Sequence, residues 1–230
     1  MPSRQKTLLF FAGFVSSVGS FAIICTSLGT QQWVSSEVRF AGGNYSGIAN
    51  VKLGLFQVTR SKTITEGVAL NTPTSVMQVF QVLKETNIVK GIHVIIILFL
   101  VISLLSSLLG SATTCFNSVS NPYLTFLGPL GVYVWTAINA AFVLLAMILG
   151  AINMEANEMP KKLAIAMDTS NDVFGSSQNT YGYSYWLLLL SIFLNAATIA
   201  VIYYYQHARY SEQKKQERPM ETASRDVILF

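Results

Sequence analysis

The sequence predicts an all-α membrane protein, a four-transmembrane-helix bundle with a small extracellular β-sheet built from its first loop. Composition is the first observation behind this prediction, because 52% of the 230 residues are hydrophobic and only 11% are charged, too apolar for a soluble domain. The second is that charge-free stretches hold four segments of roughly 20 residues, the length at which a helix crosses about 30 Å of hydrocarbon.

Charge-free gaps outline the individual spans, because a charged side chain at the bilayer centre costs about 2.5–3.5 kcal/mol. The gap between Lys90 and Glu155 is far too long for one helix, and turn residues such as Gly128-Pro129 break it into two spans. The other two spans follow Lys6 and Asp172. The four predicted spans are residues 8–28, 92–111, 130–152 and 185–205.

Four spans put both termini on one side, and the flanking charges predict that this side is cytoplasmic. Basic residues precede the first span and populate the tail, as the positive-inside tendency requires. The sequon Asn44-Tyr45-Ser46 lies in the first loop, which is therefore expected outside with Asn44 glycosylated. The expected layout has a cytoplasmic N-terminus at 1–7, extracellular loops at 29–91 and 153–184, a cytoplasmic loop at 112–129 and a cytoplasmic tail at 206–230.

The two outside loops contain only a few sequence patterns that predict secondary structure. Residues 32–40 and 51–60 have extended character, and Gly42-Gly43 and Ser46-Gly47 offer turn residues between them, so a small antiparallel sheet is expected. Residues 76–87 have helical spacing that leads into the second span. In the second loop a short helix is expected near 161–167, without recognisable chemistry.

Small and polar residues predict how the bundle packs. Helices approach closely in lipid where small side chains face each other. Asn139 and Asn195 lie near mid-span, where an unpartnered amide costs roughly several kcal/mol, so interhelical polar contacts are expected, with a functional polar site as the alternative. The small-residue faces expected inside are Ala12, Ser16 and Ser20 with Gly13 and Ser17, then Ser103, Ser107 and Ser111, then Ala137 and Ala141, then Ala196 and Ala200.

No catalytic site, metal site or cofactor is predicted, and we expect that the chain is not an enzyme. The four spans contain no Asp, Glu, Lys or Arg, which counts against a proton relay or an ion-coupled transporter. His93 and His207 have no Cys, His or carboxylate at ligand spacing and are expected to be ordinary interfacial histidines. The basic residues are scattered before the tail, so nucleic acid is not an expected partner.

Two features on the cytoplasmic side suggest further contacts. Cys115 follows the second span, a position at which reversible palmitoylation occurs, with a bare buried thiol as the alternative. The chain ends in Ile228-Leu229-Phe230, and a free carboxylate after hydrophobic residues fits a PDZ-type groove, with a chance hydrophobic ending as the alternative. Expected partners are therefore the lipid bilayer, other membrane proteins and a PDZ-type adaptor.

Several short motifs are spread along essentially the whole chain: Leu28-Gly29-Thr30, Trp33, Gly54-Leu55-Phe56, Asn121-Pro122-Tyr123 and Gly128-Pro129-Leu130-Gly131-Val132-Tyr133. Together they resemble the clarin family of small four-span membrane proteins. Trp33 with Gly54-Leu55-Phe56 is also similar to a pattern of the wider claudin-like tetraspan group. Those proteins close the extracellular sheet with a cysteine pair that is missing in this chain, which argues against a tight-junction strand former.

The resemblance implies a non-enzymatic organiser of plasma-membrane protein complexes, with relatives tied to hearing and vision through hair-cell bundles, synapses and actin. One alternative is a channel accessory subunit, with Ser103, Ser107, Ser111 and Asn139 as a polar lining. Another is a claudin-like cell–cell adhesion protein. A membrane-embedded enzyme would need titratable groups clustered in a cavity, and the sequence offers no such cluster.

Overall fold

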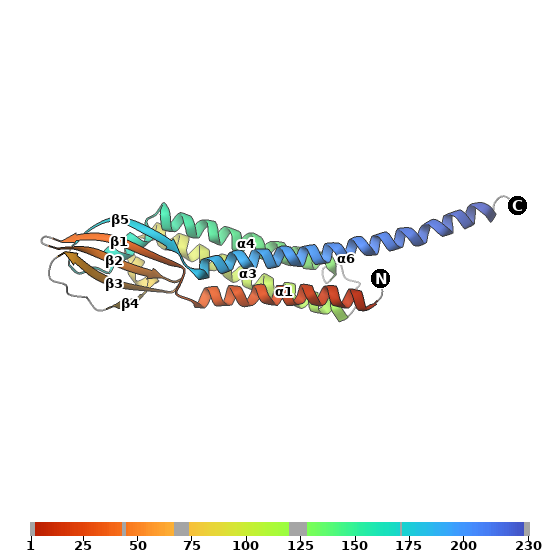
Figure 1. Cartoon of the computed structure of the whole chain (residues 1–230), viewed down its shortest axis with the longest axis horizontal. Coiled ribbons are helices and arrows are strands. Elements are labelled where there is room, and N and C mark those ends of the chain that lie inside the picture. The colour runs from red at the N-terminus through yellow and green to blue at the C-terminus, as the bar shows by residue number, and fades with distance from the viewer. Residues whose placement is uncertain (1–2, 43–44, 67–73, 120–127, 171, 228–230) are drawn as a thin grey trace.

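The computed structural model describes residues 3–42, 45–66, 74–119, 128–170 and 172–227. Four helices long and apolar enough to cross a membrane pack side by side, and a five-stranded sheet stands at one end of their bundle (Figure 1). Both chain ends lie at the opposite end. The predicted fold class, four spanning helices with a small antiparallel sheet, is confirmed.

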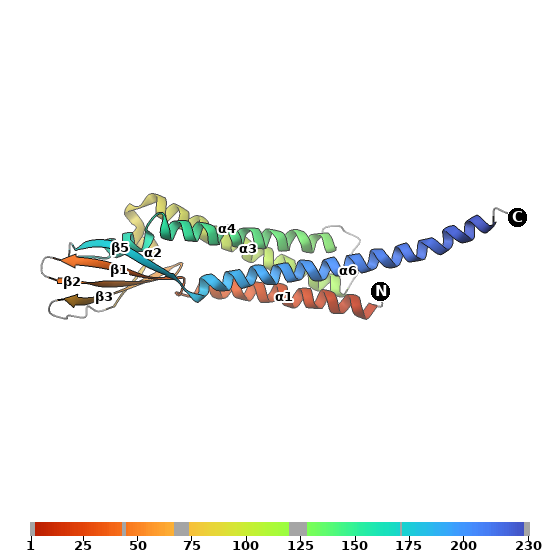
Figure 2. The ribbon, with the colours of Figure 1, turned by 45° about the horizontal axis from the view of Figure 1, so that its top comes forward.

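The four long helices are α1 (Ser3–Gly29), α3 (Asn87–Val119), α4 (Pro129–Glu155) and α6 (Tyr183–Val227). Pro129 begins α4, where the fixed φ of proline suits the first helical position and its missing N–H costs nothing. α6 continues well past the other helices toward the C-terminus (Figure 2). The helices run beyond the predicted spans, so where the bilayer begins and ends along them stays a prediction.

The sheet draws strands from two of the three connections between spanning helices: that between α1 and α3, called the first connection, and that between α4 and α6, called the second. Its strands are β1 (Val34–Gly42), β2 (Tyr45–Leu53), β3 (Gln57–Glu66), β4 (Ser75–Gln78) and β5 (Val173–Tyr181), in the order β4-β3-β2-β1-β5 with every neighbouring pair antiparallel. β5 belongs to the second connection, so the sheet is larger than the predicted one from the first loop alone. Buried residues alternate along β1 and β2, which shows that one face of the sheet is covered.

One local prediction about the first connection is wrong, and two are confirmed in part. Ser46 and Gly47 lie inside β2 and do not form a turn. A Cβ at Gly47 would lie 2.3 Å from the oxygen of Thr63, so the glycine allows β3 to approach closely. The stretch 51–60 is extended but is broken at Gly54 into β2 and β3. Residues 76–87 are helical over α2 (Val79–Val82) and η1 (Leu83–Glu85) and lead into α3, as expected, but they begin as β4, because strand pairing overrides local helical spacing there.

The helix expected near 161–167 is α5 (Met159–Ala166), which packs under the covered face of the sheet. Met159, Leu163 and Ala164 are fully buried on that side of α5. They join a core that runs from the sheet down into the adjoining ends of the bundle helices. Burial of these side chains makes the sheet and the bundle one packed unit.

The bundle interior corrects the predicted packing faces. On α3 and on most of α1 the prediction is confirmed, since the buried residues include Ser103, Ser107, Ser111, Gly13, Ser17 and Ser20. On α4 and α6 the buried faces contain polar residues such as Asn139 and Asn195, whereas the alanines expected inside are exposed: Ala137, Ala141, Ala196 and Ala200, together with Ala12 of α1. A polar side chain facing lipid would be left without a hydrogen-bond partner, so the polar residues, not the alanines, decide which face turns inward.

Candidate functional site

Trp33 connects the start of β1 to two bundle helices. Its indole Nε1 donates a hydrogen bond to the backbone oxygen of Ser27 on α1 at 2.7 Å, and its own backbone oxygen accepts from the N–H of Gly182 at 2.8 Å. The indole packs edge-on against Tyr185 of α6, with 6.4 Å between ring centroids. Only 3% of Trp33 is exposed, and a buried indole N–H needs such an acceptor. This predicted family residue therefore holds the sheet on the bundle.

The Gly54-Leu55-Phe56 segment forms the turn from β2 to β3 and is fastened to α3. His93 Nε2 donates to the backbone oxygen of Leu55 at 2.7 Å, and both residues are buried. A Cβ at Gly54 would lie 2.8 Å from the Cα of Gln31, so the chains approach too closely there for any side chain. The structure therefore buries His93 where the sheet meets the bundle, and its position relative to the membrane interface stays a prediction.

Phe56 differs from its two neighbours in the motif. Its backbone oxygen accepts from the N–H of Val79 at 3.0 Å, which joins the turn to α2, while its side chain is 47% exposed. The motif thus contributes a backbone junction at Gly54 and Leu55 and an outward aromatic side chain at Phe56.

Asn139 and Asn195 meet in the middle of the bundle. Asn139 Nδ2 donates to Asn195 Oδ1 at 3.1 Å and to Ser20 Oγ at 3.1 Å, and Ser20 Oγ lies 2.7 Å from Ser191 Oγ. These four residues come from α1, α4 and α6 and are all at least nine-tenths buried. Interhelical hydrogen bonds of this kind contribute about 0.6 kcal/mol on average in a membrane. The cluster therefore fixes how three helices meet.

Serine hydroxyls make further contacts between helices. Ser107 Oγ on α3 donates to the backbone oxygen of Ser17 on α1 at 3.1 Å. Ser16 Oγ on α1 donates to the backbone oxygen of Leu194 on α6 at 2.8 Å. The residues considered as a polar pore lining therefore include hydroxyl and amide groups that already bond neighbouring helices.

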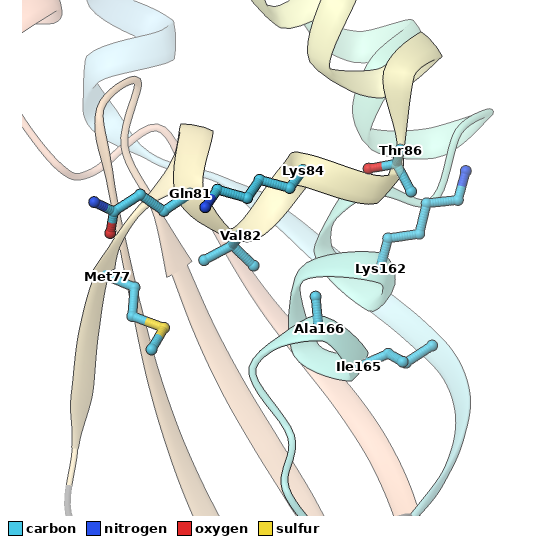
Figure 3. A pocket seen from close by; sticks show the side chains of 8 residues that line it. All are labelled: Met77, Gln81, Val82, Lys84, Thr86, Lys162, Ile165 and Ala166. Carbon is cyan, nitrogen blue, oxygen red and sulfur yellow. The ribbon is translucent and has the colours of Figure 1, made fainter.

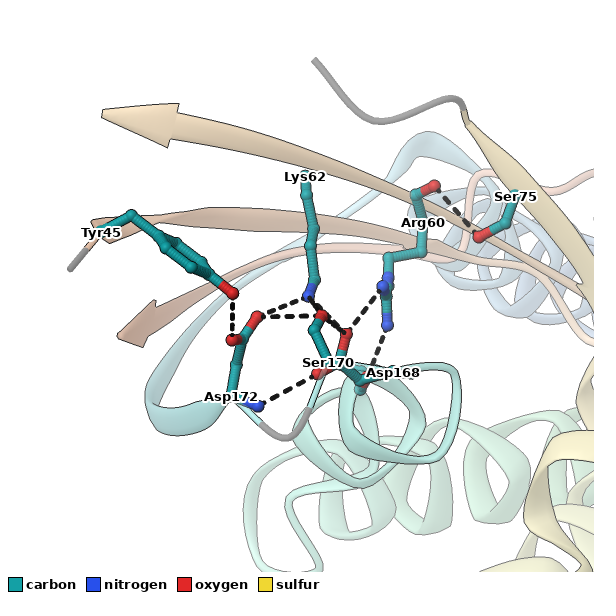
Figure 4. Close-up of polar contacts among 8 residues, drawn as sticks. Tyr45, Arg60, Lys62, Ser75, Asp168, Ser170 and Asp172 are labelled. Carbon is teal, nitrogen blue, oxygen red and sulfur yellow. Dashed lines mark hydrogen bonds and ion pairs between the residues drawn. The ribbon is translucent and has the colours of Figure 1, made fainter. Parts of the chain in front are cut away.

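Arg60 and Lys62 of β3 form a buried ion-pair network with the segment that follows α5 (Figure 4). Arg60 Nη2 lies 3.1 Å from Asp168 Oδ1, and Lys62 Nζ lies 2.7 Å from Asp172 Oδ2 and also contacts Asp168. The hydroxyl of Tyr45 donates to Asp172 Oδ1 at 2.7 Å. The side chains of Lys62, Asp168 and Asp172 are at most 5% exposed. The network joins the first connection to the second.

The charges of this network are matched to one another. Burial by itself raises the pKa of Asp168 and of Asp172, but hydrogen bonds led by that from Lys62 outweigh it and lower the pKa of both carboxyls. The hydrogen bond from Tyr45 to the charged Asp172 raises the pKa of the Tyr45 phenol. The two aspartates are therefore ionised and Tyr45 is neutral at physiological pH.

The sequence interpretation missed this network, because its halves lie more than 100 residues apart. A signal was nevertheless present. Arg60 and Lys62 sit two positions apart on a strand whose inward face begins with Val58, so both basic side chains point toward the covered face of the sheet. A buried basic pair requires acidic partners, and Asp168 and Asp172 supply them.

The remaining predicted positions lie away from these contacts. Cys115 is exposed in the last turns of α3, at the end of the bundle opposite the sheet, and Cys25 of α1 is exposed as well. Asn44 and Ile228, Leu229 and Phe230 fall outside the described residues. Within the described ranges, no group of three His, Cys, Asp or Glu side chains is arranged to hold a metal ion.

Comparisons with known proteins agree with the fold. A family model described as Clarin-2-like matches residues 4–202. Clarin-3 of Mus musculus is 43% identical and clarin-3 of Homo sapiens 42% identical to this chain, each over the full length of both proteins. Clarin-1 of Homo sapiens is 28% identical over 85% of this chain and 86% of its own length. The chain belongs to the clarin family.

Proposed function

We propose that this protein is a non-enzymatic organiser of membrane protein complexes, which presents the outer surfaces of its bundle and sheet to partner proteins. One observation carries the proposal. Most described polar groups inside the bundle bond within the chain, for example Asn139 Nδ2 to Asn195 Oδ1, and the outward helix faces are apolar. Among the described atoms, Ser103 Oγ, Asn139 Oδ1 and Asn195 Nδ2 are buried without a hydrogen-bond partner. A chain whose interior chemistry is occupied in this way acts through its surfaces.

We place the protein in the plasma membrane with both termini in the cytoplasm and the sheet outside. The basic residues around the first span and in the tail support this orientation, as does the sequon at Asn44. Glycosidase treatment of the protein from cultured cells should shift its electrophoretic mobility, and Asn44→Gln should abolish the shift. A tag on the C-terminus that antibodies reach in unpermeabilised cells would contradict the orientation.

Two cytoplasmic features would link the protein to its surroundings. Exposure of Cys115 near the cytoplasmic end of α3 is consistent with palmitoylation. The ending Ile228-Leu229-Phe230 is proposed as a ligand for a PDZ-type adaptor, through which a complex would reach the actin cytoskeleton of sensory cells. The variant Cys115→Ser tests palmitoylation, which rests on the exposure of Cys115. Truncation of 228–230 tests adaptor binding, which rests on the sequence of the tail.

Crosslinking in intact membranes tests the organiser role. We expect the chain to be captured with membrane protein partners, and proximity labelling from its tail should lose adaptor proteins when 228–230 are removed. Recovery of a monomer without partners would contradict the organiser role, and an unchanged set of labelled proteins after truncation would remove the adaptor.

Cell–cell adhesion is a second candidate, favoured by the free edge of β5. This edge strand pairs only with β1 within the described chain and contains neither charged residues nor proline, the usual protection of a sheet edge. β5 runs along the bundle axis into α6 (Figures 1 and 2). Antiparallel pairing of β5 from two copies would therefore direct their bundles in opposite directions, toward two facing membranes.

A cell aggregation assay distinguishes cell–cell adhesion from organisation of complexes within one membrane. Cells that express the protein should aggregate if β5 pairs between membranes, and Gln178→Lys with Thr180→Lys should prevent this by charging exposed positions of the edge. Absence of aggregation by the unchanged protein would leave organisation within one membrane as the function.

A further inference from the structure

A half-open pocket lies beside the sheet, away from the ion-pair network and from the contacts of Trp33. Its volume is about 470 Å³, within the roughly 300–1,000 Å³ typical of small-molecule sites. One wall comes from residues 77–86 of the first connection and the other from Lys162, Ile165 and Ala166 of α5 (Figure 3). The side chains that line this pocket take no part in the ion-pair network or in the Gly54-Leu55-Phe56 motif.

The pocket adjoins the ends of two neighbouring membrane-spanning helices. Thr86 lines it and is followed directly by Asn87, the first residue of α3. α5 starts only four positions after α4 ends at Glu155. In the first turn of α3, Ile88 is 74% exposed. An isoleucine this exposed at the start of a spanning helix suits the border of a bilayer, so we expect the pocket near the level at which lipid headgroups meet hydrocarbon.

The lining combines apolar surface with two positive charges. Met77 is 47% exposed and Ile165 is 49% exposed, and Val82 and Ala166 extend the same apolar surface. The charged members of the lining are Lys84, on the wall before α3, and Lys162, on α5. Figure 3 shows the two lysine side chains extending to opposite sides with their nitrogens directed away from each other, so the two charges flank the apolar lining. A ligand that satisfies this surface needs an acidic group and an apolar body.

We propose that this pocket binds an acidic lipid of the surrounding membrane. Its headgroup phosphate, sulfate or carboxylate lies between the flanking charges of Lys84 and Lys162, which attract it, and the upper part of its acyl chains covers Met77 and Ile165. A soluble anion would leave the apolar lining exposed to water, and an uncharged lipid would leave both positive charges uncompensated. The proposal is independent of the organiser role, because it concerns lipid and not protein partners.

The lysines set the expected size of the effect. Each Lys near an acidic lipid surface contributes about 1 kcal/mol, equivalent to about fivefold in affinity. Loss of both charges in Lys84→Gln/Lys162→Gln should therefore weaken binding about 25-fold relative to the unchanged protein. Ala166→Phe should weaken binding without altering charge, because the larger side chain fills the pocket.

Native mass spectrometry of the full chain in detergent measures this binding directly, with phosphatidylglycerol titrated against phosphatidylcholine. The matched control is Lys161→Gln, which removes a charge from α5 at a residue that pairs with Glu158 at 3.4 Å and does not belong to the lining. We expect preferential binding of phosphatidylglycerol that the control retains and that both pocket variants lose. Thermal unfolding without added lipid verifies that each variant is folded.

Three results would overturn the proposal. Equal binding of the two lipids would remove the charge selectivity. Equal loss of binding in Lys161→Gln and in Lys84→Gln/Lys162→Gln would mean that general surface charge, and not the pocket, attracts the lipid. Displacement of phosphatidylglycerol by an equal concentration of glycerol 3-phosphate would identify a site for a soluble anion, because this molecule has the headgroup charge without the acyl chains.

Discussion

Lys62 and Asp168 form a buried ion pair although 106 positions separate them in the sequence. Lys62 belongs to the first connection between spans and Asp168 to the second, with α3, α4 and α5 between them. The ammonium group of Lys62 also lies 4.9 Å from the centre of the Phe40 ring, a favourable cation–π contact. The two connections therefore form one unit, and either charge alone would be left buried with fewer partners.

Asp168→Ala should strongly destabilise the sheet. Breaking a buried ion pair costs about 3–5 kcal/mol, and Asp172 remains to compensate part of it, so we expect a loss of about 3 kcal/mol. Hydrogen exchange of β3 amides should accelerate accordingly. Glu158→Ala removes a partly exposed pair with Lys161 and should change the free energy of exchange by less than about 1 kcal/mol. Similar exchange in the two variants would contradict a structural role for the network.

Acid should weaken the same network. The pKa values of Asp168 and Asp172 are lowered in the folded chain, so the unfolded chain takes up protons more readily than the folded one. Their contribution to stability is complete above the ordinary aspartate pKa of about 3.9 and is lost as the pH falls through the lower folded values. Melting temperature should therefore fall below about pH 4, and fall less steeply in Asp172→Asn. Parallel pH curves for the two proteins would exclude this origin of acid sensitivity.

Gly54→Ala and Gly91→Ala should have opposite effects. A Cβ at Gly54 would lie 2.8 Å from the Cα of Gln31, so the turn after β2 must shift and the sheet should melt at lower temperature. Nothing lies within 4 Å of a Cβ at Gly91 in α3, where alanine stabilises a helix by about 0.5–1 kcal/mol. Thermal unfolding of the purified variants measures both shifts, and a Gly54→Ala protein as stable as Gly91→Ala would refute the close approach.

Asn139 and Asn195 should show energetic coupling. Replacing either with alanine removes their shared hydrogen bond, and the coupling energy in a double-mutant cycle should be about 0.6 kcal/mol and not above about 1.7 kcal/mol. Unfolding in mixed micelles provides the four stabilities. Ala137→Leu is the control, because Ala137 faces away from the bundle interior and a larger apolar side chain should be tolerated there. Strictly additive losses would mean that the two amides do not stabilise each other.

Particular residues show how much of the structure a local sequence pattern can predict. The four spanning helices were predictable because hydrocarbon excludes charge and demands internal backbone hydrogen bonds, constraints that act on every residue of a span. The expectation of interhelical polar contacts for Asn139 and Asn195 followed from the cost of an unpartnered amide. Ala137 and Ala196 were wrongly expected inside, because a small side chain tolerates lipid as well as protein and so does not determine which face turns inward.

The sequence by itself determined that this chain crosses a membrane through four uncharged spans and carries a small sheet, since both follow from composition and residue spacing. Only the tertiary structure decided that β5 joins the sheet from the second connection, that His93 bonds Leu55, and that Lys62 meets Asp168. Such pairings join distant segments, and their geometry depends on the packing of all elements together, which no local pattern encodes.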